Sequence, residues 1–259
     1  MTNKNKQKTS VSIIIPCYNE EANLKKGVLE QVNVFLRKQT FVWEVIICND
    51  KSTDNSLELC QDFIKTHAGF RVLDLPHGGK PSAIWAGIKA ARHPLVLFTD
   101  MDQSTPLKEI RKLLPYFVDY DIVIGSRGST RHGFSLLRKL MSRVFLLVRK
   151  LILLSQINDT QCGFKAFKTD IAKKLFPKLQ FFHQKQAVGW RVSAFDVELL
   201  FMAEIWGYKI KEVEVSWQDE DISTTKGDNS TRFKKESKQM AKEILRVKIN
   251  QIKGLYAQK

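Results

Sequence analysis

Short apolar runs alternate with segments of helical spacing along the first half of the chain. The runs at 11–15, 43–48, 70–76 and 95–98 are short, and polar residues, glycine or proline bound them. Segments with helical spacing begin near residues 20, 54 and 80. We expect Pro16 to end the first strand. Strands that alternate with helices in this way predict an α/β fold with a mostly parallel central sheet flanked by helices.

Two later segments are both strongly apolar and strongly basic. Residues 134–156 place Leu, Met and Val at helical spacing with Arg and Lys between them, and strands are predicted on either side at 120–127 and 210–217. The tail is a similar basic helix, with Leu245, Ile249, Ile252 and Tyr256 on one face. Such helices lie in a membrane interface or pack their apolar face on the sheet. The pattern leaves both placements open.

No linker, internal repeat or low-complexity tract divides the chain. We expect a disordered basic arm at 1–10, a catalytic domain at 11–235 and a C-terminal amphipathic helix at 236–259. The arm has no apolar core, so it predicts neither a signal peptide nor an anchor. No apolar run approaches the roughly 20 residues that cross a bilayer, so we expect no transmembrane helix. The four cysteines show no paired spacing and predict reduced thiols.

The net charge of +15 indicates an anionic partner, such as nucleic acid, a membrane surface or a phosphorylated substrate. The sequence contains no recognisable nucleic-acid-binding module. Its basic residues alternate with Leu and Phe rather than with aromatic stacking platforms. We therefore predict a membrane surface and a phosphorylated substrate as partners, and no nucleic acid.

Two carboxylates follow the apolar run at 95–98. Asp100 and Asp102 are two residues apart, so in extended chain both side chains point to the same side. A hard divalent cation between them would relieve their repulsion and could also bind phosphate oxygens. The alternative is a polar loop that caps the helix after Pro106. Because ligands bind at the carboxyl ends of parallel strands, Asp50, Lys80 and this pair could share one site.

Known nucleotide-binding patterns do not account for this edge of the sheet. The chain contains no Gly-x-Gly-x-x-Gly, and "HGGKPS" lacks the first glycine of a P-loop and follows the wrong strand. A metal together with basic side chains would therefore have to bind any diphosphate. Lys80, Arg127 and Arg131 are the candidates for the positive charge.

Six motifs of the chain resemble those of a known enzyme family. "VSIIIPCYNEEANL", "VIICNDKSTDNS", "GGKPSAIWAGI", "LVLFTDMDQST", "IVIGSR" and "DTQCGFKAF" occur in the order found in family 2 inverting glycosyltransferases of the GT-A fold. The last motif, with "WRVSAFDVELL", most resembles the dolichyl-phosphate β-glucosyltransferase branch, a near relative of dolichyl-phosphate mannose synthase. The resemblance covers about residues 11–217.

The resemblance implies transfer of glucose from UDP-glucose to a polyprenyl or dolichyl phosphate, with inversion and with Mg²⁺ or Mn²⁺ as cofactor. The enzyme would then be cytoplasmic, and peripheral on the cytoplasmic face of a membrane. Two alternatives remain open: a polyprenyl-phosphate mannosyltransferase that uses GDP-mannose, and a GT-A transferase acting on a hydroxyl acceptor. A hydroxyl acceptor needs a general base, whereas a phosphate is already anionic.

The resemblance also implies roles for individual residues. The nucleotide sugar would contact Pro16, Tyr18, Glu20, Asp50, Lys80, Asp100, Met101 and Asp102. The metal ligands would be Asp100 and Asp102, and the acceptor phosphate would contact Arg127, Arg131, Arg138 and Ser142. Asp102 and Arg127 would be catalytic, together with Asp159, which stands where many relatives carry the base. Structural alternatives exist for several of these: packing against the sheet for Tyr18, a helix cap for Asp50 and a solvated charge for Arg138.

Two departures from the family pattern concern the loops around the predicted site. Pro81 stands where the family often has Gly, which predicts a stiffer loop around Lys80. The loop after Trp217 is long and acidic, and the basic residue that closes over the diphosphate in relatives would be Lys226 or Arg232.

Overall fold

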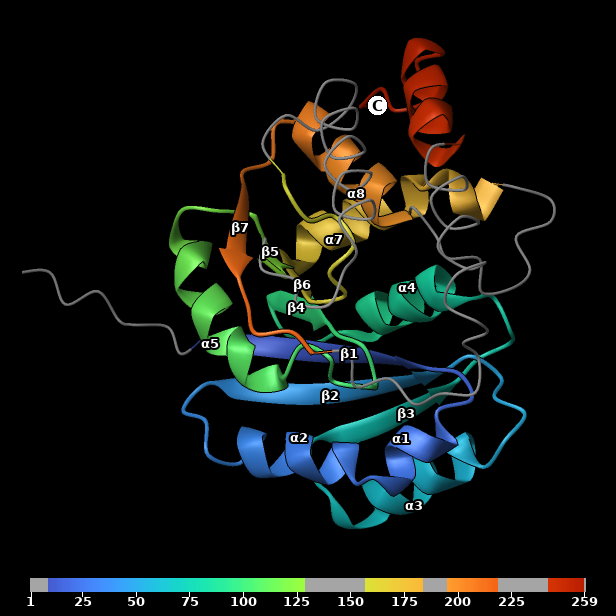
Figure 1. Cartoon of the computed structure of the whole chain (residues 1–259), viewed down its shortest axis with the longest axis vertical. Coiled ribbons are helices and arrows are strands. Elements are labelled where there is room, and N and C mark those ends of the chain that lie inside the picture. Colours follow the sequence, from blue (N-terminus) through green and yellow to red (C-terminus); the bar gives the residue numbers. More distant parts are fainter. Residues whose placement is uncertain (1–8, 129–156, 184–194, 219–241, 259) are drawn as a thin grey trace, which may run out of the picture.

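The computed structural model describes residues 9–128, 157–183, 195–218 and 242–258. A seven-stranded sheet forms its centre, in the order β3-β2-β1-β4-β6-β5-β7 (Figure 1). Only β6 runs antiparallel to its two neighbours. The strands are β1 Ser10–Cys17, β2 Val42–Asn49, β3 Phe70–Asp74, β4 Leu95–Phe98, β5 Ile122–Ser126, β6 Lys165–Lys168 and β7 Ile210–Glu214. The predicted α/β fold with a mostly parallel sheet is confirmed.

Helices cover both faces of the sheet, as Figure 1 shows. The α-helices are α1 Glu21–Lys25, α2 Val28–Leu36, α3 Ser56–Thr66, α4 Lys80–Ala90, α5 Ile110–Leu113, α7 Thr169–Leu175 and α8 Phe195–Ile205. Short 3-10 turns occur at Leu107–Glu109, Leu114–Val118, Phe176–Lys178 and Gln180–His183. A further helix spans 242–252 near the C-terminus.

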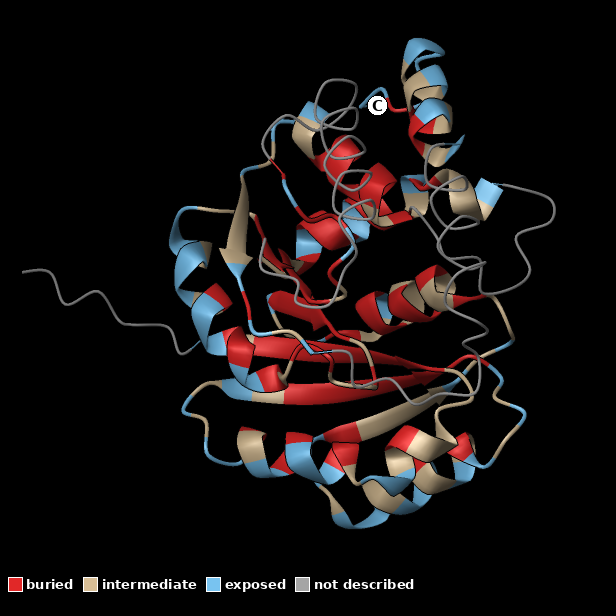
Figure 2. Ribbon diagram, in the orientation of Figure 1, coloured by how far each residue is buried: buried red, intermediate tan, exposed pale blue. Residues whose placement is uncertain are grey.

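Two apolar cores explain why the central strands are hydrophobic along their whole length. In β1, Ile13 and Ile15 point to the core beneath α2 and α5, whereas Ile14 points to the core beneath α4, α7 and α8. Successive side chains of a strand face opposite sides of the sheet, so a strand covered on both faces has no polar alternation. Figure 2 shows the resulting buried centre between exposed outer helix faces.

The position of the site follows from the strand order. The chain passes from β1 outward to β3 and then returns to place β4 on the other side of β1. In open α/β sheets, ligands bind outside the carboxyl ends of the strands where the order reverses in this way. The loops after β1, β2 and β4 meet at that edge.

Pro16 does not end the first strand, contrary to our expectation. It lies within β1 and pairs with Cys48 of β2. The pairing of β1 with β4 ends at Ile14, so no partner on that side requires an N–H from Pro16. Proline is tolerated in a strand where its missing donor is not needed.

The C-terminal helix differs from the predicted arrangement. Tyr256 is buried and lies beyond the helix, whereas Leu245, Ile249 and Ile252 remain exposed, at 60%, 41% and 77%. A different face, with Ile244 and Val247, packs on the core. The four residues predicted on one face of the helix therefore do not share a face in the structure, because Tyr256 is buried and the other three are exposed. The other predicted basic helix, 134–156, lies outside the described residues.

A buried polar cluster fastens the C-terminal segment to α8. The Tyr256 hydroxyl donates to Oε1 of the buried Glu198 over 2.7 Å, and Arg246 donates to Oε2 over 3.0 Å. Burial and the charge of Glu198 raise the pKa of Tyr256. The Trp206 indole donates to the Tyr256 carbonyl over 2.8 Å.

Tyr256→Phe should lower the free energy of unfolding by about 1–2 kcal/mol, because a buried carboxylate loses a donor. Urea denaturation would measure the loss. Tyr116→Phe is the control, since Tyr116 is exposed, and it should stay within about 0.5 kcal/mol of the unaltered protein. Equal effects for the two variants would show that the hydroxyl does not secure this segment.

Across the described segments, no helix combines the length and the apolar character needed to cross a membrane.

Candidate active site

Three loops at the carboxyl edge of the sheet contain non-glycine residues with left-handed backbone. These residues are Asn19 after β1, Lys51 after β2 and Gln103 after β4, with φ values of 55°, 57° and 52°. Side-chain bonds hold the first two loops together: Asn19 Oδ1 accepts from the Thr53 amide over 2.8 Å. Such conformations carry a modest energetic cost and tend to collect at functional sites. The pattern supports the predicted position of the site.

Asp50 is fully buried and binds the turn before α4. Its carboxylate accepts from the amides of Gly78 and Gly79 over 2.7 and 2.9 Å, and His77 Nδ1 lies 3.0 Å away. His77 also lies against Tyr18, with ring centroids 4.9 Å apart. The structure therefore gives Asp50 a definite task, which is to fix the turn that places Lys80 at the start of α4. Its contact with the base remains a prediction.

The other residues predicted for the nucleotide lie at or below the same edge. Glu20 accepts from the Asn23 amide group over 2.6 Å at the start of α1. Asp54 accepts from the amide of Ser56, the first residue of α3, over 3.0 Å. Pro16 and Met101 are buried. The Met101 side chain belongs to the core, so a contact with the nucleotide would have to come from its backbone.

Asp100 and Asp102 form a compact turn directly after β4. Asp100 Oδ1 is paired with the Lys80 ammonium group, and Asp102 Oδ1 accepts from the Ser104 amide over 2.9 Å. Gln103 closes the turn through its side-chain amide, which donates to the Asp100 carbonyl over 2.8 Å. Gly163 adjoins Asp100 so closely that a Cβ at this position would lie 2.1 Å from Oδ2. Carboxylate oxygens suit Mg²⁺ or Mn²⁺, so the residues present fit the predicted cofactor.

Charged groups continue from this pair into the interior. Burial works to lower the pKa of Lys80, but the carboxylates of Asp100, Asp196 and Asp102 outweigh it and raise the pKa. Burial raises the pKa of Asp196, and the ammonium groups of Lys165 and Lys80 only partly offset this. Lys165 is fully buried, and its Nζ lies 2.8 Å from Asp196 Oδ1. Lys80 therefore lies among carboxylates and keeps its positive charge.

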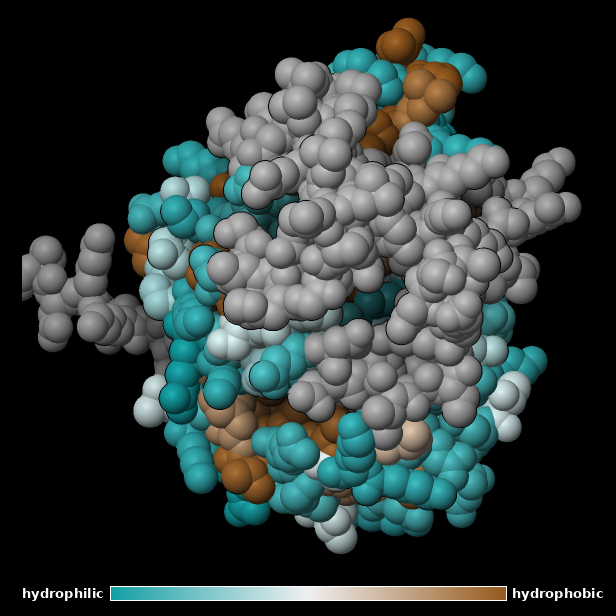
Figure 3. Space-filling view, viewed as in Figure 1, coloured by the Kyte–Doolittle hydropathy of each residue, from teal (hydrophilic) through white to brown (hydrophobic). Residues whose placement is uncertain are grey.

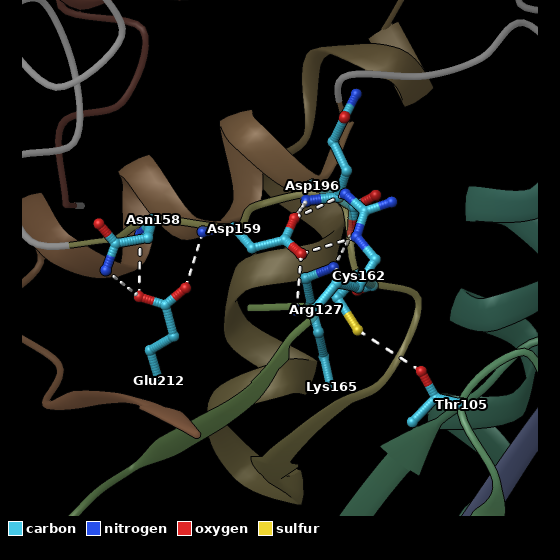
Figure 4. Close-up of polar contacts among 9 residues, drawn as sticks. Thr105, Arg127, Asn158, Asp159, Cys162, Lys165, Asp196 and Glu212 are labelled. Carbon is cyan, nitrogen blue, oxygen red and sulfur yellow. Dashed lines mark hydrogen bonds and ion pairs between the residues drawn. The ribbon is translucent and has the colours of Figure 1, made fainter. Parts of the chain in front are cut away.

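Arg127 and Asp159 form a two-pronged ion pair beside these groups, as Figure 4 shows. Arg127 donates through Nε and Nη2 to the two Asp159 oxygens, each over 2.7 Å, and its own amide donates over 3.0 Å. Trp217 lies 5.6 Å from the guanidinium, and Glu212 accepts from the Asp159 amide over 2.7 Å. Burial acts to lower the pKa of Arg127, but the bonds to Asp159 prevail and raise it.

This pairing bears on both predicted roles. The Asp159 oxygens also accept from the Gln161 amide over 3.0 Å, so the carboxylate is surrounded by donors. Such a carboxylate is better suited to orienting Arg127 than to taking a proton from an acceptor. The roles of Asp159 as base and of Arg127 as phosphate contact stay predictions. Several other predicted residues lie outside the described residues: Arg131, Arg138, Ser142, Lys226 and Arg232.

Sequence reasoning missed four residues of the site: His77, Gly163, Lys165 and Asp196. Asp196 and Lys165 lie within "WRVSAFDVELL" and "DTQCGFKAF", two stretches with family resemblance, but no spacing rule marks them. His77 directly precedes the glycine pair before Lys80, which was the available signal for a ligand loop.

The comparison with protein families decides the class of the protein. The model of "Glycosyl transferase family 2" matches residues 12–176, which include the loops after β1, β2 and β4 and the Asp159 segment. The chain belongs to glycosyl transferase family 2. It is therefore a glycosyltransferase, as the motifs predict.

Relatives within this family share sequence over most of the chain. A dolichyl-phosphate beta-glucosyltransferase from Drosophila melanogaster is 34% identical over 82% of this chain and 68% of its own length. Its counterpart from Dictyostelium discoideum is 31% identical over 95% of this chain and 76% of its own. The glycosyltransferase is thus related to dolichyl-phosphate beta-glucosyltransferases.

Solved structures confirm the GT-A-like fold of this glycosyltransferase. Glucosyl-3-phosphoglycerate synthase from Mycobacterium tuberculosis, in complex with Mn²⁺, UDP and glucosyl-3-phosphoglycerate, matches with a TM-score of 0.62 and 18% identity. The match covers 92% of this chain and 80% of that one. A mannosyltransferase from Pyrobaculum calidifontis, in complex with GDP-Man and Mn²⁺, matches with a TM-score of 0.55 and 17% identity. This match covers 81% of this chain and 57% of the mannosyltransferase chain.

Proposed function

We propose that this glycosyltransferase transfers glucose from UDP-glucose to a polyprenyl phosphate of the dolichyl class, and that the product is a β-linked lipid-phosphate sugar. The relationship to dolichyl-phosphate beta-glucosyltransferases over most of the chain supports the donor and the acceptor. The observation that carries the acceptor assignment is the ion pairing of the site. Asp159 is paired with Arg127, and Asp196 with Lys165. A phosphate acceptor is already anionic and needs no general base.

The described residues divide the reaction between two cationic regions. Asp100 and Asp102 would hold Mg²⁺ or Mn²⁺, which when bound supplies Lewis-acid stabilisation to the leaving diphosphate. Lys80 adds a fixed positive charge beside them. Arg127, held by Asp159 and Trp217, offers its remaining N–H groups to the acceptor phosphate. Attack of the acceptor opposite the leaving group inverts the anomeric centre.

The surface supports a membrane-bound acceptor. The C-terminal helix exposes Leu245, Ile249 and Ile252, and Lys242 and Lys253 are exposed on the same segment. Figure 3 shows hydrophobic side chains on this helix, at the top of the view. Apolar side chains flanked by lysine favour the interface of an anionic bilayer. We therefore place the enzyme peripherally on the cytoplasmic face of a membrane.

A lipid-extraction assay tests the proposal. Purified protein, polyprenyl phosphate in vesicles and Mn²⁺ are incubated separately with labelled UDP-glucose, GDP-mannose and UDP-N-acetylglucosamine. We expect label in the organic phase from UDP-glucose only, and its loss with EDTA. Label from GDP-mannose instead would correct the donor. Metal-dependent donor hydrolysis without labelled lipid would overturn the acceptor and leave the donor site intact.

Asp159→Asn separates a phosphate acceptor from a hydroxyl acceptor. With a phosphate acceptor, the variant loosens Arg127, and the KM for polyprenyl phosphate should rise about tenfold while kcat changes little. With a hydroxyl acceptor and Asp159 as base, kcat should fall by about 100-fold or more. Steady-state kinetics with varied lipid distinguishes the two. Asp119→Asn, on an exposed acid far from the site, is the matched control.

A further inference from the structure

Lys165 is a buried cation that the proposed reaction does not use directly. It begins β6 between Phe98 of β4 and Ile124 of β5, and its side chain is fully buried. Its ammonium group lies 2.8 Å from Asp196 Oδ1, donates to the Cys162 carbonyl, and lies 5.7 Å from the Phe98 ring. Removing an ammonium group from water is strongly unfavourable unless partners compensate. The position therefore calls for an explanation beyond packing.

The ion pair of Lys165 with Asp196 lies toward the residues proposed to stabilise the leaving diphosphate. Asp196 is the second residue of α8, and its side chain is only 14% exposed. Its negative charge acts on the ammonium groups of both Lys165 and Lys80. Lys80 in turn is paired with Asp100. Two ion pairs, Lys165–Asp196 and Lys80–Asp100, are thus coupled through the charge of Asp196.

The hydrogen bond from Lys165 to the Cys162 carbonyl lies toward the proposed metal ligands. This bond holds the turn that continues into Gly163. Gly163 adjoins the Asp100 carboxylate, and Cys162 Sγ lies 3.7 Å from the Thr105 hydroxyl, just beyond the Asp100–Gln103 turn. Figure 4 shows Lys165, Cys162 and Thr105 in this arrangement. One ammonium group therefore connects to Asp100 by two separate routes.

We infer that Lys165 and Asp196 are a positioning pair, which holds Lys80 and Asp100 in the geometry required to stabilise the leaving nucleoside diphosphate. This inference rests on the proposed function for the identity of the leaving group. Neither residue needs to touch the substrate. Asp196 limits where the Lys80 ammonium group can lie, and Lys165 keeps Asp196 from drawing Lys80 away from Asp100.

A double-mutant cycle separates positioning from simple fold stabilisation. Lys165→Met and Asp196→Asn each leave a buried group without its partner, so both should lower the urea midpoint. The double variant contains no unpaired charge and should recover most of that loss, because apolar or neutral replacements of buried ion pairs are often tolerated. Because the double variant is the one expected to fold well, it carries the functional measurement.

The functional readouts are UDP affinity in the presence of Mn²⁺, by calorimetry, and steady-state kinetics. UDP carries the full charge of the leaving diphosphate, so the double variant should bind it about tenfold more weakly although its stability has recovered. The kcat should fall by about the same factor, with the KM for the donor changed less than about threefold. GDP is measured in parallel, so that an error in the assigned nucleotide does not mask the effect.

A matched control lies on the same strand. Lys168 pairs with Asp121 over 2.8 Å at the other end of β6, away from the site. Lys168→Met with Asp121→Asn repeats the chemistry of the test and should leave UDP affinity and kcat unchanged.

Recovery of both stability and UDP affinity in the double variant would overturn the inference and reduce the pair to a structural role. A fall in kcat with unchanged UDP affinity would also overturn it, since the pair would then not act on the groups that bind the leaving diphosphate. If the unaltered protein binds UDP with Mn²⁺ but glycosylates no lipid, the proposed acceptor is wrong. The cycle then still decides the inference through UDP affinity.

Discussion

Asp102→Asn should reduce sugar transfer by about 1,000-fold or more while the protein remains folded. Asparagine has nearly the same shape, and its side-chain oxygen can still accept from the Ser104 amide, so the turn after β4 should persist. The variant loses the negative charge that a divalent cation requires at this position. Among the described residues, Lys80 would then supply the positive charge beside the leaving diphosphate. The lipid-extraction assay gives the rate, and thermal unfolding gives the state of the fold.

Two measurements check that this effect is specific to the proposed metal site: the activity of an exposed-acid control variant and the Mn²⁺-dependent binding of UDP. Asp119→Asn removes one charge from an exposed site and should keep full activity. Mn²⁺-dependent UDP binding, measured by calorimetry, should weaken strongly in Asp102→Asn and not in the control. Retention of more than about a tenth of the activity would mean that Asp102 does not hold the catalytic metal, because metal-site charges contribute several kcal/mol.

The sheet and the place of the site were predictable because both follow from local rules. Strand residues alternate between two faces, and uninterrupted apolar runs indicate strands covered on both. The βαβ alternation then places the residues after β1, β2 and β4 at one edge. Asp100, Asp102 and Lys80 were expected at this edge because each follows a strand, and the pairing of Asp100 with Lys80 agrees with that placement. The metal-binding role of Asp100 and Asp102 was implied by the family resemblance and stays a prediction.

Lys165 and Asp196 could not be recognised in the same way. In "GFKAFK" the two lysines are three positions apart, so they fall on opposite faces of a strand and the pattern does not indicate which of them is buried. Only the insertion of β6 between β4 and β5 buries Lys165, and that pairing joins residues about 70 positions apart. Periodicity carries no information about such contacts. Asp196 is likewise buried only because α8 begins beside this strand.

Two further differences depend on residues distant in the sequence, which local patterns leave undetermined. Pro16 remains in β1 because the neighbouring β4 is short, which depends on the length of another strand. Tyr256 is buried because its hydroxyl binds Glu198, 58 residues earlier in the chain. Proline can end a strand or lie within one, and tyrosine can be exposed or buried. In each case, a contact or strand distant in the sequence determines which occurs.

Gly163→Ala should reduce activity by about 100-fold with little change in stability, because displacing a catalytic group by about 1 Å has effects of that size. A Cβ at this position would lie 2.1 Å from Asp100 Oδ2 and 2.7 Å from its Cγ, so the carboxylate must move. The backbone of Gly163 needs no left-handed conformation, and the contact involves the end of a short side chain. The fold can therefore adjust while Asp100, the proposed metal ligand, loses its position.

Gly27→Ala is the control for Gly163→Ala, because here the stability should change and the activity should not. Gly27 has a φ of 77°, but a Cβ there would meet nothing within 4 Å. The variant should lose about 1 kcal/mol of stability through backbone strain and keep full activity below its unfolding temperature. Activity and urea unfolding are measured for both variants. Normal activity in Gly163→Ala would show that Asp100 relaxes without consequence, and that the turn at 162–163 does not set the geometry of the metal ligands.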